Sequence, residues 1–174
     1  MQNKRPKIIV FTGPESTAKS TLSKHISEEY GARWEPEYAR DYVEGLNRSY
    51  TYDDVVKIAK YQIESYWKAC ELNQSLIVFD TFLIITKVWL SEVYHRVPEW
   101  VEHFLSEVKI DLHLLCYPDL EWVADGIREN EAKRMYLFEQ YELELKMYNF
   151  TYQIIKGQGH ERYQQAINHI NQIL

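Results

Sequence analysis

Short apolar runs that alternate with helix-like stretches are the feature that most constrains the fold of this 174-residue chain. The clearest run is LIVFD, residues 76–80, which is apolar until its final carboxylate. A continuous apolar run is typical of a strand in a parallel sheet that is covered on both faces. The pattern predicts strands at residues 7–12, 32–35, 76–80, 112–117 and 152–157.

Stretches with apolar residues at helical spacing separate these strands. Thr51 begins the longest of them, with Asp54 three residues later in a variant of the capping box. Strands that alternate with helices predict an α/β fold with a parallel sheet. No linker or repeat interrupts the pattern, so we expect a single domain over residues 1–174. Helices are expected at residues 18–30, 37–46, 51–70, up to 94, after 98, at 129–148 and at the end of the chain.

The composition is that of an ordinary folded protein, with 45% hydrophobic and 26% charged residues. A net charge of −6 argues against a nucleic-acid partner. No apolar stretch reaches the length of about 18 residues that a membrane span needs, and the N-terminus is no signal peptide. The two cysteines form no disulfide pattern, so we expect a reducing, cytoplasmic location. The oligomeric state stays open.

The stretch GPESTAKST, residues 13–21, follows the first predicted strand and opens the first predicted helix. It fits the phosphate-binding loop G-x-x-x-x-G-K-[ST] except at Ala18, which stands in place of the second glycine. The backbone amides of such a loop and the helix N-terminus can hold a phosphate. The residues predicted to bind the nucleotide here are Gly13, Pro14, Glu15, Ser16, Thr17, Ala18, Lys19, Ser20 and Thr21.

Two residues of the loop carry its chemistry. Lys19 would reach the β- and γ-phosphates, and Ser20 would bind Mg²⁺. Ala18 would be strained by about 1–2 kcal/mol if its φ is positive, which weakens the loop but removes no catalytic charge. The motif therefore predicts a working nucleotide site, of reduced affinity, rather than an inactive one.

Asp80 and Thr81 stand at the carboxyl end of the LIVFD strand. A carboxylate there, beside a phosphate loop, can hold Mg²⁺ or accept the proton of an attacking hydroxyl. The alternative is that either residue caps the following helix.

Two further charged stretches are candidates for substrate contacts. WEPEYARDY, residues 34–42, combines carboxylates, Arg40 and aromatic rings, which suits a hydroxylated planar ligand or simply a solvated helix start. DGIRENEAKR, residues 125–134, contains Arg128 and Arg134 after a glycine, which suits a mobile lid or a charged surface. The histidines show no metal-binding spacing, and the H-x-G-H and G-x-S-x-G signatures are absent.

GPESTAKST, PEYAR, VFDT with Trp89 downstream, and DGIR with Arg134 together resemble the ribosylnicotinamide kinase domain of NadR-type proteins, a branch of the P-loop nucleoside kinases. The resemblance spans almost the whole chain in order. It implies a five-stranded parallel sheet, a lid segment, and phosphorylation of nicotinamide riboside to nicotinamide mononucleotide by ATP. The adenylyltransferase and DNA-binding portions of multidomain members lie outside it, so we expect neither NAD synthesis nor repressor activity.

Under this resemblance each candidate residue has an expected role. Lys19 and Arg128, with help from Arg134, would stabilise the migrating phosphoryl group, and Ser20 and Asp80 would hold Mg²⁺. Glu37 or Asp80 would orient the 5′-hydroxyl, and the sequence does not choose between them. The remaining substrate contacts are expected from Arg40, Trp34, Tyr42 and Trp89. The alternatives are a kinase for another nucleoside and a regulatory nucleotide-binding protein without turnover.

Overall fold

The computed structural model of the protein describes residues 5–123 and 131–174. Within these ranges five strands form one parallel sheet in the order β2-β3-β1-β4-β5. The α/β fold with a five-stranded parallel sheet is therefore confirmed. The strands are β1 (Lys7–Thr12), β2 (Arg33–Glu35), β3 (Leu76–Asp80), β4 (Leu112–Cys116) and β5 (Tyr152–Ile155).

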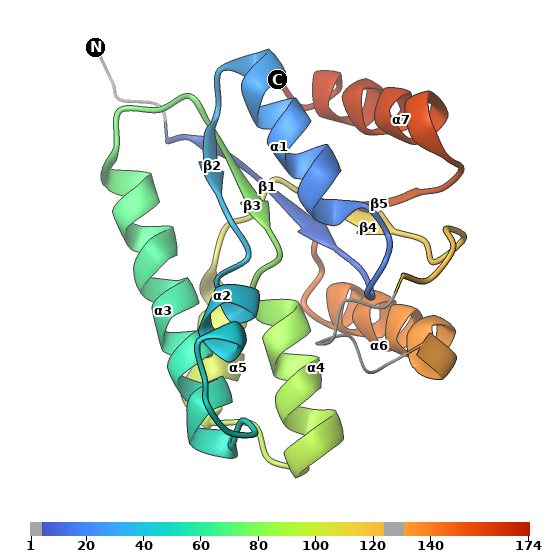
Figure 1. Cartoon of the computed structure of the whole chain (residues 1–174). Coiled ribbons are helices and arrows are strands. Elements are labelled where there is room, and N and C mark those ends of the chain that lie inside the picture. Colours follow the sequence, from blue (N-terminus) through green and yellow to red (C-terminus); the bar gives the residue numbers. More distant parts are fainter. Residues whose placement is uncertain (1–4, 124–130) are drawn as a thin grey trace.

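Helices cover both faces of the sheet (Figure 1). One face carries α1 (Lys19–Tyr30) and α7 (Gly159–Asn171). The opposite face carries α3 (Tyr52–Glu71), α4 (Leu83–Tyr94), α5 (Glu99–Glu107) and α6 (Arg134–Met147). The short helix α2 (Tyr38–Glu44) follows β2 and packs beside α3.

The central strand β1 shows why the sequence pattern was informative. Ile8 and Val10 pack in the core under α3 to α6, whereas Ile9 and Phe11 pack in the core under α1 and α7. Successive side chains of a strand point to opposite faces of the sheet. Both faces are covered, so each of these residues must be apolar, and the strand appears as a continuous apolar run.

Element boundaries differ from the sequence-based prediction in two informative places. Helix α1 begins at Lys19, one residue late, because Ala18 has a left-handed backbone with φ of 62°. Helix α6 begins at Arg134 after a 3₁₀ turn at Glu131–Lys133, whereas the pattern predicted a start near residue 129. Most of the predicted lid, residues 125–134, lies outside the described residues.

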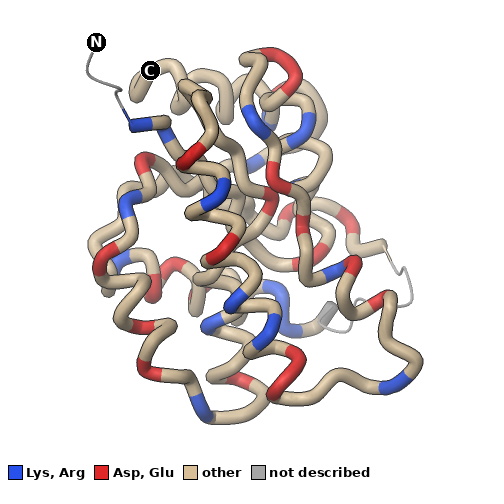
Figure 2. The backbone as a smooth tube through the Cα atoms, turned by 90° about the vertical axis from the view of Figure 1, so that its left-hand side faces the viewer, with Lys and Arg blue, Asp and Glu red and all other residues tan. Residues whose placement is uncertain are grey.

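The parallel arrangement brings the loops after all five strands to one edge of the sheet. In open α/β sheets, ligands bind at this carboxyl edge. Acidic and basic residues are interspersed along the tube on the side of the molecule seen in Figure 2. None of the helices within residues 5–123 and 131–174 is long and apolar enough to cross a membrane.

Candidate active site

The loop between β1 and α1 has the backbone geometry of an anion-binding site. Gly13 has φ of 146°, and a Cβ atom there would lie 2.6 Å from the carbonyl oxygen of Cys116 at the end of β4. Only glycine therefore fits at this position without moving β4. Ser16 and Ala18 are both left-handed, with φ of 54° and 62°. Such residues before a helix are typical of nests in which successive amides converge on an anion.

The φ of Ala18 is positive, which is the condition under which alanine is strained here. An L-residue with a side chain is strained in this region of the backbone map by about 1–2 kcal/mol, whereas glycine is not. Ala18 thus occupies the conformation for which the loop motif normally uses glycine.

Lys19 lies across the same loop. Its Nζ donates a hydrogen bond to the carbonyl oxygen of Pro14 at 2.7 Å, and the Thr17 hydroxyl donates to the same oxygen at 2.8 Å. The lysine charge is therefore held at the concave side of the loop by a neutral acceptor. A phosphate at the loop would offer this ammonium group a charged acceptor, which makes a stronger hydrogen bond.

Asp80 ends β3 directly beside the loop, because Asp80 pairs with Phe11 of β1 and Thr81 donates its amide to the Phe11 carbonyl at 3.1 Å. The Asp80 side chain is buried, with 1% of its surface exposed. Its Oδ1 atom has no hydrogen-bond partner among the described residues. A buried carboxylate oxygen without a partner is costly, so this atom is suited to a cation or a ligand.

The pKa of Asp80 reports which groups surround it. Burial raises this pKa to about 6, and a hydrogen bond with Ser20 opposes the rise. The charge of Glu37 raises the pKa further, while the charges of Lys19 and Arg40 lower it. The fold thus brings together Lys19, Ser20, Glu37, Arg40 and Asp80, which the sequence placed in three separate motifs.

The donor set around Asp80 fits Mg²⁺. A carboxylate oxygen without a partner and the Ser20 hydroxyl are hard oxygen ligands. Mg²⁺ in phosphoryl-transfer sites uses one or two protein oxygens and takes its other ligands from phosphate and water. Within the described residues no group of three or more His, Cys, Asp or Glu side chains is placed to hold a metal ion. Mg²⁺ that is bound together with phosphates does not require such a group.

Helix α2 presents the charged residues of the WEPEYARDY stretch. Glu37 precedes its first turn, and the Arg40 Nε lies 3.7 Å from the Glu37 carboxylate. A second carboxylate, Glu44, lies 3.8 Å from the Arg40 guanidinium. The Tyr42 hydroxyl donates to Asp54 at the start of α3 at 2.9 Å, which fixes the Tyr42 ring between the two helices.

The structure corrects the prediction for Trp34. The half-buried Trp34 indole packs against the core under α1 and α7, and its Nε1 donates to the Ser23 hydroxyl of α1 at 3.1 Å. Its neighbour Glu35 points the other way and accepts from Ser65 of α3 at 2.8 Å. Adjacent strand residues face opposite sides of the sheet. Because the Trp34 indole is engaged with α1, we remove it from the candidate stacking residues.

Trp89 lies on the face of the sheet that α3 and α4 cover. Its ring meets Tyr50, in the segment between α2 and α3, edge to face at 4.8 Å between centroids. Both Trp89 and Tyr50 are half-buried. Trp89 therefore stays a candidate for contact with a planar ring, with Tyr50 as a neighbour that the sequence did not single out.

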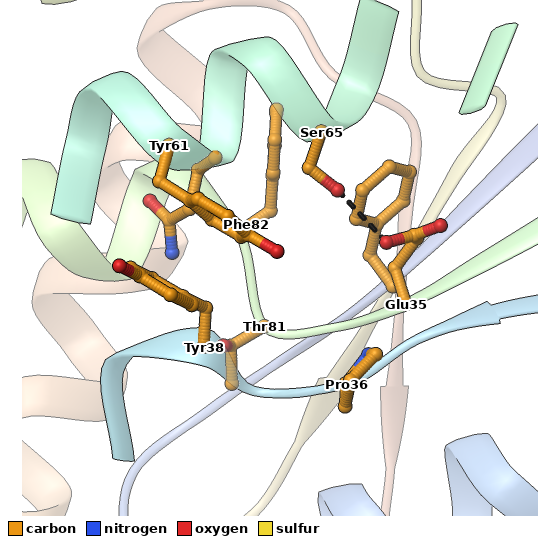
Figure 3. Close-up of a pocket in the computed structure, with 9 residues that line it drawn as sticks. Glu35, Pro36, Tyr38, Tyr61, Ser65, Thr81 and Phe82 are labelled. Atoms are coloured by element: carbon orange, nitrogen blue, oxygen red, sulfur yellow. Dashed lines mark hydrogen bonds between the residues drawn. The ribbon is translucent and has the colours of Figure 1, made fainter. Parts of the chain in front are cut away.

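A small cavity lies behind the start of α2 (Figure 3). Tyr38 and Tyr61 stack over it at 3.5 Å between ring centroids, and Glu35 and Ser65 close another side. Its volume of about 10 Å³ suffices for one water molecule and not for a nucleoside. This cavity belongs to the packing that supports α2.

A larger pocket of about 500 Å³ lies between the starts of α1 and α7, next to the phosphate loop. Its volume is within the usual range for small-molecule sites. Apart from Ala18 and Thr21, sequence analysis singled out none of its residues as site residues, because no local motif marks them. The pocket is lined by Ala18, Thr21, Leu22, His25, Leu120, Gly159, His160, Arg162 and Tyr163.

The two predicted lid arginines have different outcomes. Arg128 lies outside the described residues. Arg134 is largely buried, and its guanidinium donates to the carbonyl oxygens of Pro118 and Leu120 at 2.8 and 2.7 Å. Its Nε has no partner among the described residues. Arg134 therefore anchors the loop after β4, and this loop reaches the phosphate loop where the Val123 amide donates to the Ser16 hydroxyl at 3.1 Å.

Comparison with known proteins places the chain in a family. The family model described as "AAA domain" matches residues 8–162, which is most of the chain. The chain belongs to the AAA domain family. In this family member the matched range includes the phosphate loop, Asp80 and Arg162.

The predicted resemblance to NadR-type proteins is confirmed. The chain is 28% identical over 124 residues to the trifunctional NAD biosynthesis/regulator protein NadR of Salmonella typhimurium and, equally, to that of Escherichia coli. These matches cover 69% of the chain but 30% of each relative, so the chain spans about a third of the length of the curated relatives.

Solved structures agree on the fold. A NadR protein in complex with NR superposes with a TM-score of 0.81 at 24% identity, over 98% of this chain and 52% of that one. The deoxyadenosine kinase of M. mycoides superposes with a TM-score of 0.66 at 17% identity, over 95% of this chain and all of that one. The fold is therefore that of the P-loop nucleoside kinases.

Proposed function

We propose that this chain is an ATP-dependent kinase that phosphorylates nicotinamide riboside on its 5′-hydroxyl, giving nicotinamide mononucleotide and ADP. One observation carries the proposal. The buried Asp80, with an oxygen that lacks a partner among the described residues, lies beside Ser20 and Lys19 at the end of two adjacent strands. This combination supplies the metal ligand, the phosphate-binding charge and the nest that phosphoryl transfer needs.

On the phosphate side, the amides of residues 13–21 and the Lys19 ammonium would hold the β- and γ-phosphates. Ser20 and Asp80 would hold Mg²⁺, which supplies positive charge that neutralises the phosphates. The pocket of about 500 Å³ beside Ala18 is open enough for the base of the nucleotide, with Tyr163 and His25 among its walls. Arg128 is proposed, from the resemblance alone, as a further phosphate contact. Arg134 would support the nucleotide site through the loop after β4.

On the acceptor side, we assign the proton-accepting role to Glu37. Asp80 is the carboxylate next to Ser20, so its oxygens are needed for the ion, whereas Glu37 stands on α2 beside Arg40. The hydroxyl proton passes to Glu37 as the hydroxyl oxygen bonds to the γ-phosphorus. The bond between that phosphorus and the bridging oxygen of ADP breaks. Positioning and charge account for most of the rate in such reactions.

The identity of the nucleoside rests on similarity and on the acceptor-side residues together. The NadR relatives act in NAD biosynthesis by their name, and one NadR structure was solved with NR. Arg40 and Glu37 suit ribose hydroxyls, and the rings of Trp89 and Tyr42 suit a flat base.

A panel of nucleosides tests the proposal. ADP formation with Mg²⁺-ATP is measured with nicotinamide riboside, adenosine, uridine and thymidine, and we expect nicotinamide riboside to be the fastest. A faster reaction with thymidine or adenosine would favour a kinase for another nucleoside. Nucleotide binding without turnover on any member would favour a regulatory protein, with Ala18 as the weakened loop position.

A further inference from the structure

Among the described residues, Arg162 is the most fully buried arginine or lysine side chain, and the proposed chemistry gives it no role. It lies in the first turn of α7, and 1% of its surface is exposed. No motif in the sequence marks it. A buried guanidinium requires several acceptors and a counter-ion, so its partners show what it holds.

The partners of Arg162 come from three loops. Its Nε donates to the Gly157 carbonyl after β5 at 2.8 Å, and one terminal nitrogen donates to the Thr17 carbonyl in the phosphate loop at 3.0 Å. The other terminal nitrogen donates to the Tyr117 carbonyl after β4 at 2.9 Å and to the Asp119 carboxylate. Because β1, β4 and β5 are neighbours in the sheet, one side chain can tie their loops together.

Asp119 completes the arrangement as the counter-ion. Its second oxygen accepts the Gly157 amide at 2.7 Å, so the loops after β4 and β5 are joined by both members of the pair. The Arg162–Asp119 ion pair therefore holds the loops after β4 and β5 together. The hydrogen bond from Arg162 to the Thr17 carbonyl links this pair to the phosphate loop.

The Thr17 carbonyl belongs to the peptide that leads into Ala18. A trans peptide is planar, with its carbonyl and amide pointing in opposite directions. The bond from Arg162 therefore fixes the direction of the Ala18 amide, which is one of the donors of the phosphate nest. Ala18 is left-handed with φ of 62°, a conformation that is strained for alanine and unstrained for glycine.

We propose that Arg162 is a positioning residue for the phosphate loop: through the Thr17 carbonyl it keeps Ala18 left-handed and its amide directed at the nucleotide phosphates. Arg162 thus takes over the conformational role that the missing second glycine would have. The inference rests on the proposed nucleotide site but does not depend on which nucleoside is phosphorylated.

A double-mutant cycle between Arg162 and Ala18 tests this role. The binding of Mg²⁺-AMP-PNP is measured by calorimetry, without nucleoside, for the natural chain, Arg162→Lys, Ala18→Gly and the double variant. Lysine keeps the charge but cannot reach all the acceptors of a planar fork. We expect Arg162→Lys to weaken binding about tenfold, and Ala18→Gly to recover most of that loss in the double variant.

The coupling energy between Arg162 and Ala18 distinguishes a positioning role of Arg162 from a general effect on the stability of the fold. Ile170→Val is the matched control, since Ile170 is buried in the last turn of the same helix, whereas Arg162 lies in the first turn. It should lower the thermal midpoint and leave AMP-PNP binding unchanged. Equal effects of Ala18→Gly in the natural and Arg162→Lys backgrounds would overturn the proposal, as would the same loss of binding in Ile170→Val.

Ala18→Gly alone decides the question if Arg162→Lys does not fold. Because Arg162 already holds the turn, the glycine variant should gain less than about threefold in affinity while its thermal midpoint rises. A tenfold gain would show that the turn is not held and would overturn the proposal. Absence of AMP-PNP binding by the natural chain would overturn both the positioning role and the proposed function. Binding without coupling would overturn the positioning role alone.

Discussion

The phosphate side and the acceptor side of the candidate site are built in different ways. On the phosphate side, Gly13 touches β4, Arg162 holds the Thr17 carbonyl and Asp80 is buried at a strand end. On the acceptor side, α2 buries none of its residues, and the contacts of Arg40 with Glu37 and Glu44 span 3.7 and 3.8 Å. One side is part of the core of the protein, and the other rests on its surface.

This difference indicates how the two substrates would be received. Buried groups with fixed partners are arranged before a ligand arrives, which favours charge stabilisation in the transition state. Exposed helices with few buried contacts belong to the least stable parts of a fold and can move on binding. We therefore expect substitutions on the phosphate side to lower the rate of the chemical step. Substitutions at α2 should instead change kcat/KM for the nucleoside.

Lys19→Ala should give the largest effect. Loss of the ammonium group removes charge that would stabilise the migrating phosphoryl group, and kcat should fall about 10²–10³-fold. The fold should persist, because Lys19 is half-buried and its hydrogen bond to the Pro14 carbonyl is a contact within the loop. Steady-state kinetics and circular dichroism measure both. Retention of the natural rate would show that the loop is not the phosphate site.

Glu37→Gln tests the acceptor side. Loss of the proton acceptor should lower kcat/KM for the nucleoside by about 10²-fold, while AMP-PNP binding stays as it is. The matched control is Glu44→Gln on the same helix, which removes the other carboxylate near Arg40. A similar loss in both variants would mean that the effect arises from Arg40, and a loss of nucleotide affinity would move the acceptor pocket away from α2.

The pH dependence tests the buried state of Asp80. Burial raises its pKa to about 6, and the carboxylate form is the one that can hold Mg²⁺. Because kcat/KM reports the pKa values of the free enzyme, kcat/KM for Mg²⁺-ATP should fall as the pH drops through 6, to about a tenth of its pH 8 value at pH 5. A kcat/KM that stays constant between pH 8 and pH 5 would contradict this environment for Asp80.

The same pKa shift predicts a stability effect of opposite sign. A carboxyl with a raised pKa in the folded state stabilises the fold below its unfolded value of 3.8, and this contribution is lost as the pH rises through about 6. At pH 8 the buried charge then costs about 3 kcal/mol. Asp80→Asn should be inactive when assayed with Mg²⁺-ATP. Without Mg²⁺ or nucleotide it should melt at a higher temperature than the natural chain at pH 8. A lower midpoint would contradict the prediction.

The smallest effects concern the two tryptophans. Trp89→Ala should raise the KM of the nucleoside about tenfold by removing a ring contact. Trp34→Phe should leave that KM within about twofold and lower the free energy of unfolding by about 1 kcal/mol, because it removes the hydrogen bond to Ser23. A larger rise in the KM of the nucleoside for Trp34→Phe than for Trp89→Ala would restore Trp34 to the substrate site.

Most of the phosphate side was predictable because its signals are local. The loop lies between a strand and a helix, and Asp80 ends a strand, so neighbouring residues are enough to place them. The missing glycine marked Ala18 as the position to examine, and the structure shows that it is left-handed. These features depend on backbone geometry over a few residues, and sequence patterns report that geometry well.

Other parts depended on topology. Arg162 contacts Thr17 across 145 positions of sequence, and no motif links them. Trp34 was misjudged because β2 has three residues, too few for alternation to reveal which face each side chain takes. The grouping of Glu37, Arg40 and Asp80 became visible only when β2 was found beside β3.

The central claim, transfer of phosphate from ATP to a nucleoside hydroxyl at this edge of the sheet, is tested most directly by ³¹P NMR of one reaction. The natural chain is incubated with Mg²⁺, ATP and nicotinamide riboside, with Lys19→Ala as the blank. The account predicts equal amounts of ADP and a phosphate monoester coupled to the 5′-methylene protons, and about a hundredth or less of either in the blank over the same time. Inorganic phosphate without the monoester, or an unchanged ATP spectrum, would contradict it.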